Sequence, residues 1–275
     1  MPNEPRSSPW RQGHVLPEDA IRTLNLADPG ASDGAIAVLI THDCDVVADQ
    51  DREPSVEIMT GTRIRALDGN ATHGKSARTL HLGFHRDGDL IPVQLRARDK
   101  RPLDKHALRR YAPDAAWSLD ADNLSILQRW LASRYRRAAF PEAFEACLQK
   151  TQLDKALVNV VKPLGALVRA VYFDVTEPQE SETAEGPAYD LGIVLVYDAY
   201  QREGSAEVEK AAVAIAKRFR KTLEHGGRSR PYAVEFRSCE AVSDEALTYK
   251  QSLELKQWRL DYLSLRDDPQ QSMPD

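Results

Sequence analysis

The stretch 35-AIAVLITHDCD-45 places an unbroken apolar run directly before a polar cluster. A short apolar run without alternation is typical of a strand that is buried on both faces. The end of such a strand is also where a rigid scaffold presents functional side chains to solvent. Residues 35–41 therefore predict a buried strand, and residues 42–45 predict a candidate site.

That candidate site is a tetrad of His42, Asp43, Cys44 and Asp45. Two carboxylates, an imidazole and a thiol can be ligands of a divalent metal, or a nucleophile with its base. In an extended chain His42 and Cys44 face away from Asp43 and Asp45, so all four converge only if the chain turns. The alternative is an Asx-turn in which both aspartates cap backbone N–H groups and Cys44 fills the core.

A second polar cluster is 72-THGKSAR-78, with His81 beyond it. A glycine beside a histidine and a lysine lets the backbone approach an anion closely. Lys75 and Arg78 can hold a phosphate or a carboxylate, although the spacing of a P-loop is absent. We expect His73 and Lys75 to act in catalysis, and Arg78 and His81 to bind substrate. The alternative is an exposed hairpin loop with solvated charges.

The two clusters suggest metal-assisted phosphodiester hydrolysis as a first mechanism. A Mg²⁺ or Mn²⁺ ion would have four ligands, namely His42, Asp43, Asp45 and Glu57. Lys75 would stabilise the developing charge. The arrangement is similar to restriction-type nucleases, but the acid-x-lysine triplet of those enzymes is absent here.

A second mechanism is that of a cysteine hydrolase. Cys44 would be the nucleophile and His73 or His81 its base. Asp43 or Asp45 would then orient that base. An inert packed cysteine is the competing interpretation.

The opening segment 10-WRQGHVL-16, taken with 38-VLITHDCD-45, resembles the SH3-like barrel of the PemK/MazF-type proteins. Those proteins begin with a short glycine-containing strand and later place a polar loop after an apolar strand. The resemblance covers residues 10–90 and implies a small barrel, with ribonuclease activity in some members. An extra segment, residues 17–34, departs from that pattern, and no arginine here is matched to the catalytic arginine of the family.

The rest of the chain alternates between strand and helix signals, with an irregular region over residues 96–116. We expect strands near 56–60, 79–84, 91–95, 167–175, 189–199 and 232–237, and helices near 118–140, 141–161, 205–225 and 243–265. This order predicts an α+β fold with an N-terminal β-rich, barrel-like part, a helical middle, and an α+β C-terminal part with antiparallel strands. We expect a disordered tail over 1–9, domains over 10–115 and 116–275, and a mobile acidic loop over 177–188.

Composition narrows the class of protein. The chain has 275 residues, a net charge of -5 and three scattered cysteines, which argues against a disulfide framework and for a reducing compartment. Apolar runs fall short of a membrane span, and the first residues lack the apolar core of a secretory signal. We therefore expect a cytoplasmic protein of bacterial type without a membrane partner.

The function that these observations favour is an intracellular hydrolase acting on a phosphodiester or nucleotide substrate, and specifically a metal-dependent nuclease. Its partner would be a nucleic acid or a nucleotide. One alternative is a non-catalytic interaction or regulatory component with a protein partner. Another is the cysteine-dependent hydrolase.

Overall fold

The computed structural model describes residues 8–26, 34–133, 140–176, 189–224 and 234–259. The chain divides into two compact units, Met1–Tyr135 and Arg136–Asp275, called here the amino-terminal and the carboxy-terminal unit. The expected boundary after residue 115 precedes α4 (Ala121–Ser133), which packs against the sheet of the amino-terminal unit. Most of the expected tail over 1–9 and all of the acidic loop over 177–188 lie outside the described residues.

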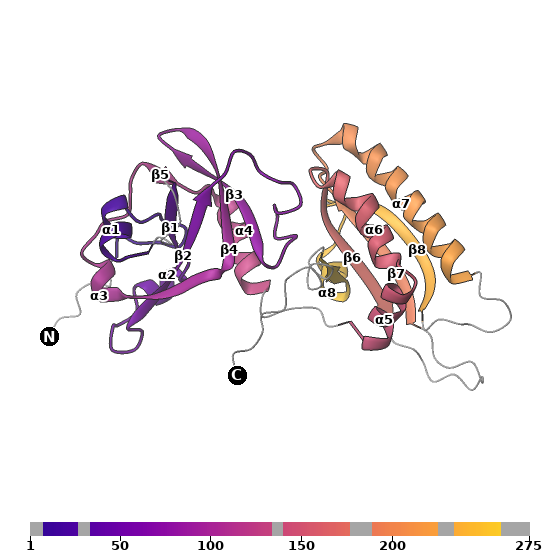
Figure 1. Cartoon of the computed structure of the whole chain (residues 1–275), viewed down its shortest axis with the longest axis horizontal. Coiled ribbons are helices and arrows are strands. Elements are labelled where there is room, and N and C mark those ends of the chain that lie inside the picture. The colour runs from indigo at the N-terminus through magenta and orange to yellow at the C-terminus, as the bar shows by residue number, and fades with distance from the viewer. Residues whose placement is uncertain (1–7, 27–33, 134–139, 177–188, 225–233, 260–275) are drawn as a thin grey trace, which may run out of the picture. The chain divides into compact units, whose positions relative to one another are not determined.

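The amino-terminal unit is built on a curved, half-barrel sheet in which every strand pair is antiparallel (Figure 1). The order across the sheet is β1-β2-β4-β3-β5. The strands are β1 (Ala35–Leu39), β2 (Ser55–Arg63), β3 (Thr79–Arg86), β4 (Asp89–Asp104) and β5 (Trp117–Ser118). A single bridge between Val15 and Val38 places the segment 10–16 along the free edge of β1.

Strand β1 is buried on both faces, as its apolar run predicts. Ile36 and Val38 point into one apolar cluster, and Ala37 and Leu39 point into another. Helix α4 covers the first cluster with residues that include Trp130. The second cluster is covered by α1 (Glu18–Thr23) and α3 (Lys105–Leu108). One strand thus separates two small cores.

Strand β4 corrects the sequence interpretation of residues 96–116 as irregular. It continues as far as Asp104 and pairs with β2 along its second half, after pairing with β3 along its first half. The register of β2 against β4 shifts between Met59 and Gly61, and the mostly charged stretch 96–99 of β4 lies opposite this shift. Tertiary pairing therefore overrides the weak local strand propensity of this stretch.

The carboxy-terminal unit has a mixed sheet in the order β8-β7-β6-β9. Its strands are β6 (Val168–Thr176), β7 (Tyr189–Tyr197), β8 (Val234–Ser243) and β9 (Lys256–Trp258). Strand β6 pairs antiparallel with β7, as expected, and also with β9, which lies where a helix was expected. Strands β7 and β8 are parallel instead, because the long helix α7 (Arg202–Glu224) returns the chain to the same end of the sheet.

Helices of the carboxy-terminal unit pack on the sheet through one apolar cluster. Figure 1 shows α6 (Leu153–Val161) and α7 lying across the strands. The expected single helix over 141–161 is two helices, α5 (Glu142–Lys150) and α6, since Gln152 between them has a left-handed backbone with φ of 57°. The 3-10 turn η1 (Lys162–Leu164) follows α6.

The expected final helix from Ser243 is wrong within the described residues. Strand β8 runs on through Ser243, and the helix α8 (Tyr249–Glu254) begins later, with a capping box between Thr248 and Gln251. Mixed helices and strands confirm the α+β class. None of the helices in the described part of the chain has the length and apolar character needed to cross a bilayer.

Candidate functional site

The tetrad predicted as a candidate site turns into a helix instead of extending the strand. Asp43 begins α2 (Asp43–Val46), and His42 is its N-cap. The Nδ1 atom of His42 accepts a hydrogen bond of 3.3 Å from the backbone N–H of Cys44. The His42 imidazole is therefore held by local backbone, while the side chains of Cys44 and Asp45 are exposed to solvent.

Asp43 connects the tetrad to the opening segment of the chain. Its Oδ1 accepts a 2.7 Å hydrogen bond from the backbone N–H of Gln12, and its Oδ2 lies 3.9 Å from Arg11 Nε. The side-chain amide of Gln12, through Nε2, donates a separate 2.6 Å hydrogen bond to the carbonyl of Ile40. Burial and the Arg11 charge lower the pKa of neighbouring His14, against a smaller opposing effect of Asp43. Asp43 thus connects the polar cluster after β1 with the opening segment 10–16.

The four expected metal ligands are not gathered into one group. The Glu57 backbone pairs with Thr41, but its carboxylate lies 2.6 Å from Lys100 Nζ on the neighbouring strand. Across the described residues, no three His, Cys, Asp or Glu side chains are arranged to hold a metal ion. Asp43, meanwhile, is engaged with the Gln12 backbone.

The second cluster is a loop that packs against α4. Lys75 is buried, and its Nζ donates a 2.7 Å hydrogen bond to the carbonyl of Gly69. Trp130 of α4 lies against Gly74 and donates from Nε1 to the Ser76 carbonyl at 2.8 Å. His73 is exposed and has a left-handed backbone with φ of 55°. The contacts of Lys75 therefore hold the loop together.

The two remaining expected residues also have contacts with the backbone. His81 is buried in β3, where its Nδ1 accepts from the Asp68 N–H at 3.0 Å and its Nε2 lies 3.2 Å from the Gln94 amide. Arg78 is partly buried, and its carbonyl accepts from the Ala97 N–H. The structure thus gives His81 a structural role that the spacing of the motif did not indicate.

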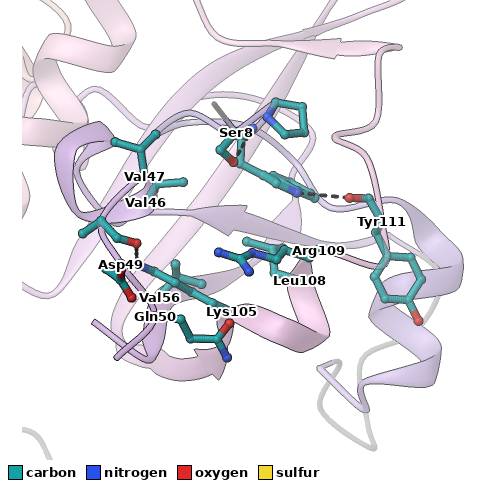
Figure 2. Close-up of a pocket in the computed structure, with 13 residues that line it drawn as sticks. Ser8, Val46, Val47, Asp49, Gln50, Val56, Lys105, Leu108, Arg109 and Tyr111 are labelled. Atoms are coloured by element: carbon teal, nitrogen blue, oxygen red, sulfur yellow. Dashed lines mark hydrogen bonds between the residues drawn. The ribbon is translucent and has the colours of Figure 1, made fainter. Parts of the chain in front are cut away.

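A hollow of about 580 Å³ lies beside the C-terminal end of α2 (Figure 2). Its walls come from the opening segment, the end of α2 with the residues after it, and α3. The lining residues are Ser8, Pro9, Trp10, Val46, Val47, Ala48, Asp49, Gln50, Val56, Lys105, Leu108, Arg109 and Tyr111. We call this hollow the α2–α3 pocket.

Apolar side chains form the base of the α2–α3 pocket. Trp10, Val46, Val56 and Leu108 are all buried members of one core cluster. Trp10 is fixed because its Nε1 donates to the carbonyl of Tyr111 at 3.1 Å, a bond drawn in Figure 2. The base of the pocket is therefore a packed part of the fold.

Lys105 carries the buried charge of the pocket. Only 3% of the residue is exposed, and its Nζ donates to the carbonyls of Asp45 at 2.5 Å and Ala48 at 3.1 Å. These carbonyls lie at the C-terminal end of α2, where a cation is favoured. Burial lowers the pKa of Lys105, while the carboxylates of Glu53, Asp45 and Asp49 oppose that shift.

Arg109 adds a second cation to the α2–α3 pocket. It follows α3 as the C-cap residue, and Figure 2 shows its side chain in the same hollow as that of Lys105. Its charge contributes to the lowered pKa of Lys105. Among the described residues, neither cation forms an ion pair with a carboxylate, although Asp49 lies on the wall. The pocket therefore presents two positive groups over an apolar base.

Sequence reasoning missed Lys105 and Arg109. The available signal was Asp104, whose carboxylate caps α3 by accepting from the N–H groups of His106 and Ala107. That pattern predicts a helical turn. It does not predict that the first residue of the turn carries its ammonium inside the fold, because the partner carbonyls lie far away in the chain.

A second hollow, of about 410 Å³, lies in the carboxy-terminal unit on β6, β7, β8 and α8. Arg237 crosses it above Gly192, where a Cβ atom would lie 2.6 Å from the guanidinium. Arg237 is already paired with Asp174 and, at 2.6 Å, with Asp190. This cation is therefore neutralised by direct ion pairs within the protein, whereas Lys105 and Arg109 form no direct ion pair among the described residues.

Comparison of the chain with known protein families, curated proteins and solved structures found no match. The functional argument therefore depends on the geometry of the chain itself.

Proposed function

We propose that the amino-terminal unit is a ligand-binding module whose α2–α3 pocket takes a small anionic molecule with an apolar body. The observation that carries the proposal is the buried ammonium of Lys105, which is bonded to carbonyls and not to a carboxylate. A buried cation without a directly paired carboxylate is costly. The Glu53, Asp45 and Asp49 charges offset part of that cost, and a bound carboxylate or phosphate would offset more.

The size and lining of the pocket support the same class of ligand. A volume of about 580 Å³ lies within the range of small-molecule sites. Trp10, Val56 and Leu108 form its apolar base, while Lys105 and Arg109 line it with positive charge. A ligand that combines both features would satisfy both parts of the wall.

Binding fits the arrangement of the side chains better than bond cleavage does. The tetrad side chains cap backbone or face solvent, and Lys75 is bonded to the Gly69 carbonyl. No nucleophile, base and charge-stabilising group thus share one concave site in the geometry described above. The nuclease and cysteine hydrolase functions stay predictions, and a binding role accounts for more of what is seen.

The test compares two adjacent arginines. Both side chains are exposed, but Arg109 lines the pocket and Arg110 does not. The probes are a nucleoside 5′-monophosphate and hexanoate, with the uncharged nucleoside as the control ligand, titrated by calorimetry. We expect Arg109→Gln to weaken binding of an anionic probe about tenfold, and Arg110→Gln to leave it unchanged.

Two results would contradict this proposal. One is that neither anion binds, or that the uncharged nucleoside binds as tightly as its phosphate. The other is that Arg109→Gln and Arg110→Gln weaken binding equally, which would indicate attraction by overall charge and not by the pocket.

A further inference from the structure

Two arginines of the amino-terminal unit meet over one tryptophan ring. Arg63 ends β2 and Arg86 ends β3, and both strands run antiparallel to β4, so both arginines lie toward the same end of the sheet. Their guanidinium carbons lie 5.0 and 5.4 Å from the ring centroid of Trp117. This ring is buried and packs edge-on against Phe84, so it is a fixed support for both cations.

One carboxylate lies between the two guanidinium groups. The same oxygen of Glu18, Oε1, is 4.0 Å from Arg63 Nη2 and 3.9 Å from Arg86 Nη2. Both distances are longer than a hydrogen bond, and the Glu18 side chain is 71% exposed. A long, exposed ion pair of this kind is weak. Glu18 therefore neutralises the arginine pair only loosely, and a better anion can replace it.

The arginine pair also has unused hydrogen-bonding capacity. Arg63 Nε is buried and has no acceptor among the described residues. Each guanidinium is a planar fork of N–H donors, which matches the several acceptor oxygens of a phosphate group better than one distant carboxylate oxygen. The site thus fits a phosphate in both charge and number of donors.

We propose that Arg63 and Arg86 form a phosphate-binding site in which Glu18 takes the place of the ligand when no phosphate is bound. Trp117 holds the arginines from below, and its burial leaves no free face for stacking on a base. Recognition is therefore of the phosphate group itself. This site shares no residue with the α2–α3 pocket.

The decisive experiment uses the whole chain and inorganic phosphate in equilibrium dialysis. We expect Glu18→Gln to bind phosphate about threefold more tightly than the wild type, because the competing internal carboxylate is lost. The double variant Arg63→Gln/Arg86→Gln should bind about tenfold more weakly or not measurably. Arg110→Gln, which removes an exposed arginine outside both proposed sites, serves as the matched control and should bind as the wild type does.

A second arm identifies the source of the phosphate group. A short single-stranded oligothymidylate without terminal phosphates competes with inorganic phosphate if the site accepts a phosphodiester backbone, and does not compete if it accepts only a phosphate monoester. Either outcome supports a phosphate site once wild-type binding is established.

Three results overturn the inference. They are an absence of binding by both probes, no gain in affinity for Glu18→Gln, and an equal loss of affinity in Arg110→Gln and the double variant. Glu18 is exposed, so Glu18→Gln should fold normally, and its circular dichroism spectrum and thermal midpoint establish that before dialysis. A purely structural bridge predicts only a small drop in that midpoint and no gain in binding.

Discussion

Lys105 carries a positive charge into the interior of the amino-terminal unit, where its ammonium donates hydrogen bonds to two carbonyl oxygens and none to a carboxylate. The two carbonyls close the C-terminal end of α2, so the same side chain lines a pocket and supports a helix. Replacing it would leave both carbonyls unpaired, which costs about 1–3 kcal/mol for a buried polar group.

The lowered pKa of Lys105 gives a prediction about pH. The unfolded chain has the ordinary pKa, so between the two pKa values it binds more protons than the folded protein does. The free energy of unfolding should therefore rise with pH through that window. We expect the difference between wild type and Lys105→Met, measured by urea denaturation, to grow as the pH rises toward the ordinary lysine pKa of about 10.4.

Arg110→Gln is the control for this pH dependence. It keeps Lys105 and the Arg109 charge that lowers the pKa of Lys105, and a guanidinium does not titrate in this range, so the pH-dependent gain should remain. A wild type whose advantage over Lys105→Met is flat across the range would show that burial does not shift the pKa of Lys105 as described.

The cysteines give a second prediction at this scale. Burial, with repulsion from the Glu240 carboxylate, raises the pKa of the Cys239 thiol to about 12. Cys147 is buried and Cys44 is exposed. In the folded protein we expect iodoacetamide to modify Cys44 first, with Cys239 and Cys147 protected until denaturant is added, as mapped by peptide mass spectrometry. Rapid modification of Cys239 near neutral pH would contradict this order.

Among the elements, β2 and β3 contain a matched pair of glycines. A Cβ atom at Gly61 would lie 2.6 Å from the buried Leu95 side chain and 3.0 Å from the Gln94 carbonyl. At Gly83 the one short contact, 2.7 Å, is with the end of Leu90, which is 56% exposed and free to move. The two positions therefore differ in whether the neighbour can give way.

We expect Gly61→Ala to lower the free energy of unfolding by about 1–3 kcal/mol, because the added methyl group would crowd the buried Leu95 side chain and the Gln94 carbonyl of the neighbouring strand. Gly83→Ala should cost less than about 1 kcal/mol. Chemical denaturation of both variants tests this. An equal loss of unfolding free energy in the two variants would mean that the sheet adjusts around position 61 as readily as around position 83.

The elements also show how far sequence pattern reaches. The run 35–40 predicts β1 correctly because burial on both faces leaves an unbroken apolar signature. The charged second half of β4 has no such signature, since pairing with β2 holds it in place. In the candidate site, the turn propensity of Asp43 was readable, but its actual partner, Gln12, was not. Contacts between distant segments are the part that periodicity cannot supply.

For the whole molecule, the division into two units matches the division of the core. No apolar cluster of the described residues draws on both units: two clusters belong to the amino-terminal unit and one to the carboxy-terminal unit. Each unit buries enough apolar area around its own sheet to be a folding domain. Both proposed binding sites lie within the amino-terminal unit.

This separation predicts that residues 1–135 fold when produced alone. We expect the fragment to unfold cooperatively in urea and to keep the effect of Arg109→Gln on anion binding. Phe173 lies in the core of the carboxy-terminal unit. In the full chain, Phe173→Ala should lower the urea midpoint of that unit without changing the midpoint of the amino-terminal unit. A fragment without cooperative unfolding would mean that the units depend on each other.

The bonds from Lys105 to Asp45 and Ala48 span 60 and 57 residues of chain. During synthesis α2 leaves the ribosome well before Lys105 does, so the carbonyls of the new helical turn at first lack their hydrogen-bond donor. The pocket wall therefore cannot close until α3 emerges, and a chain released before that point would present an unfinished turn to proteases and chaperones.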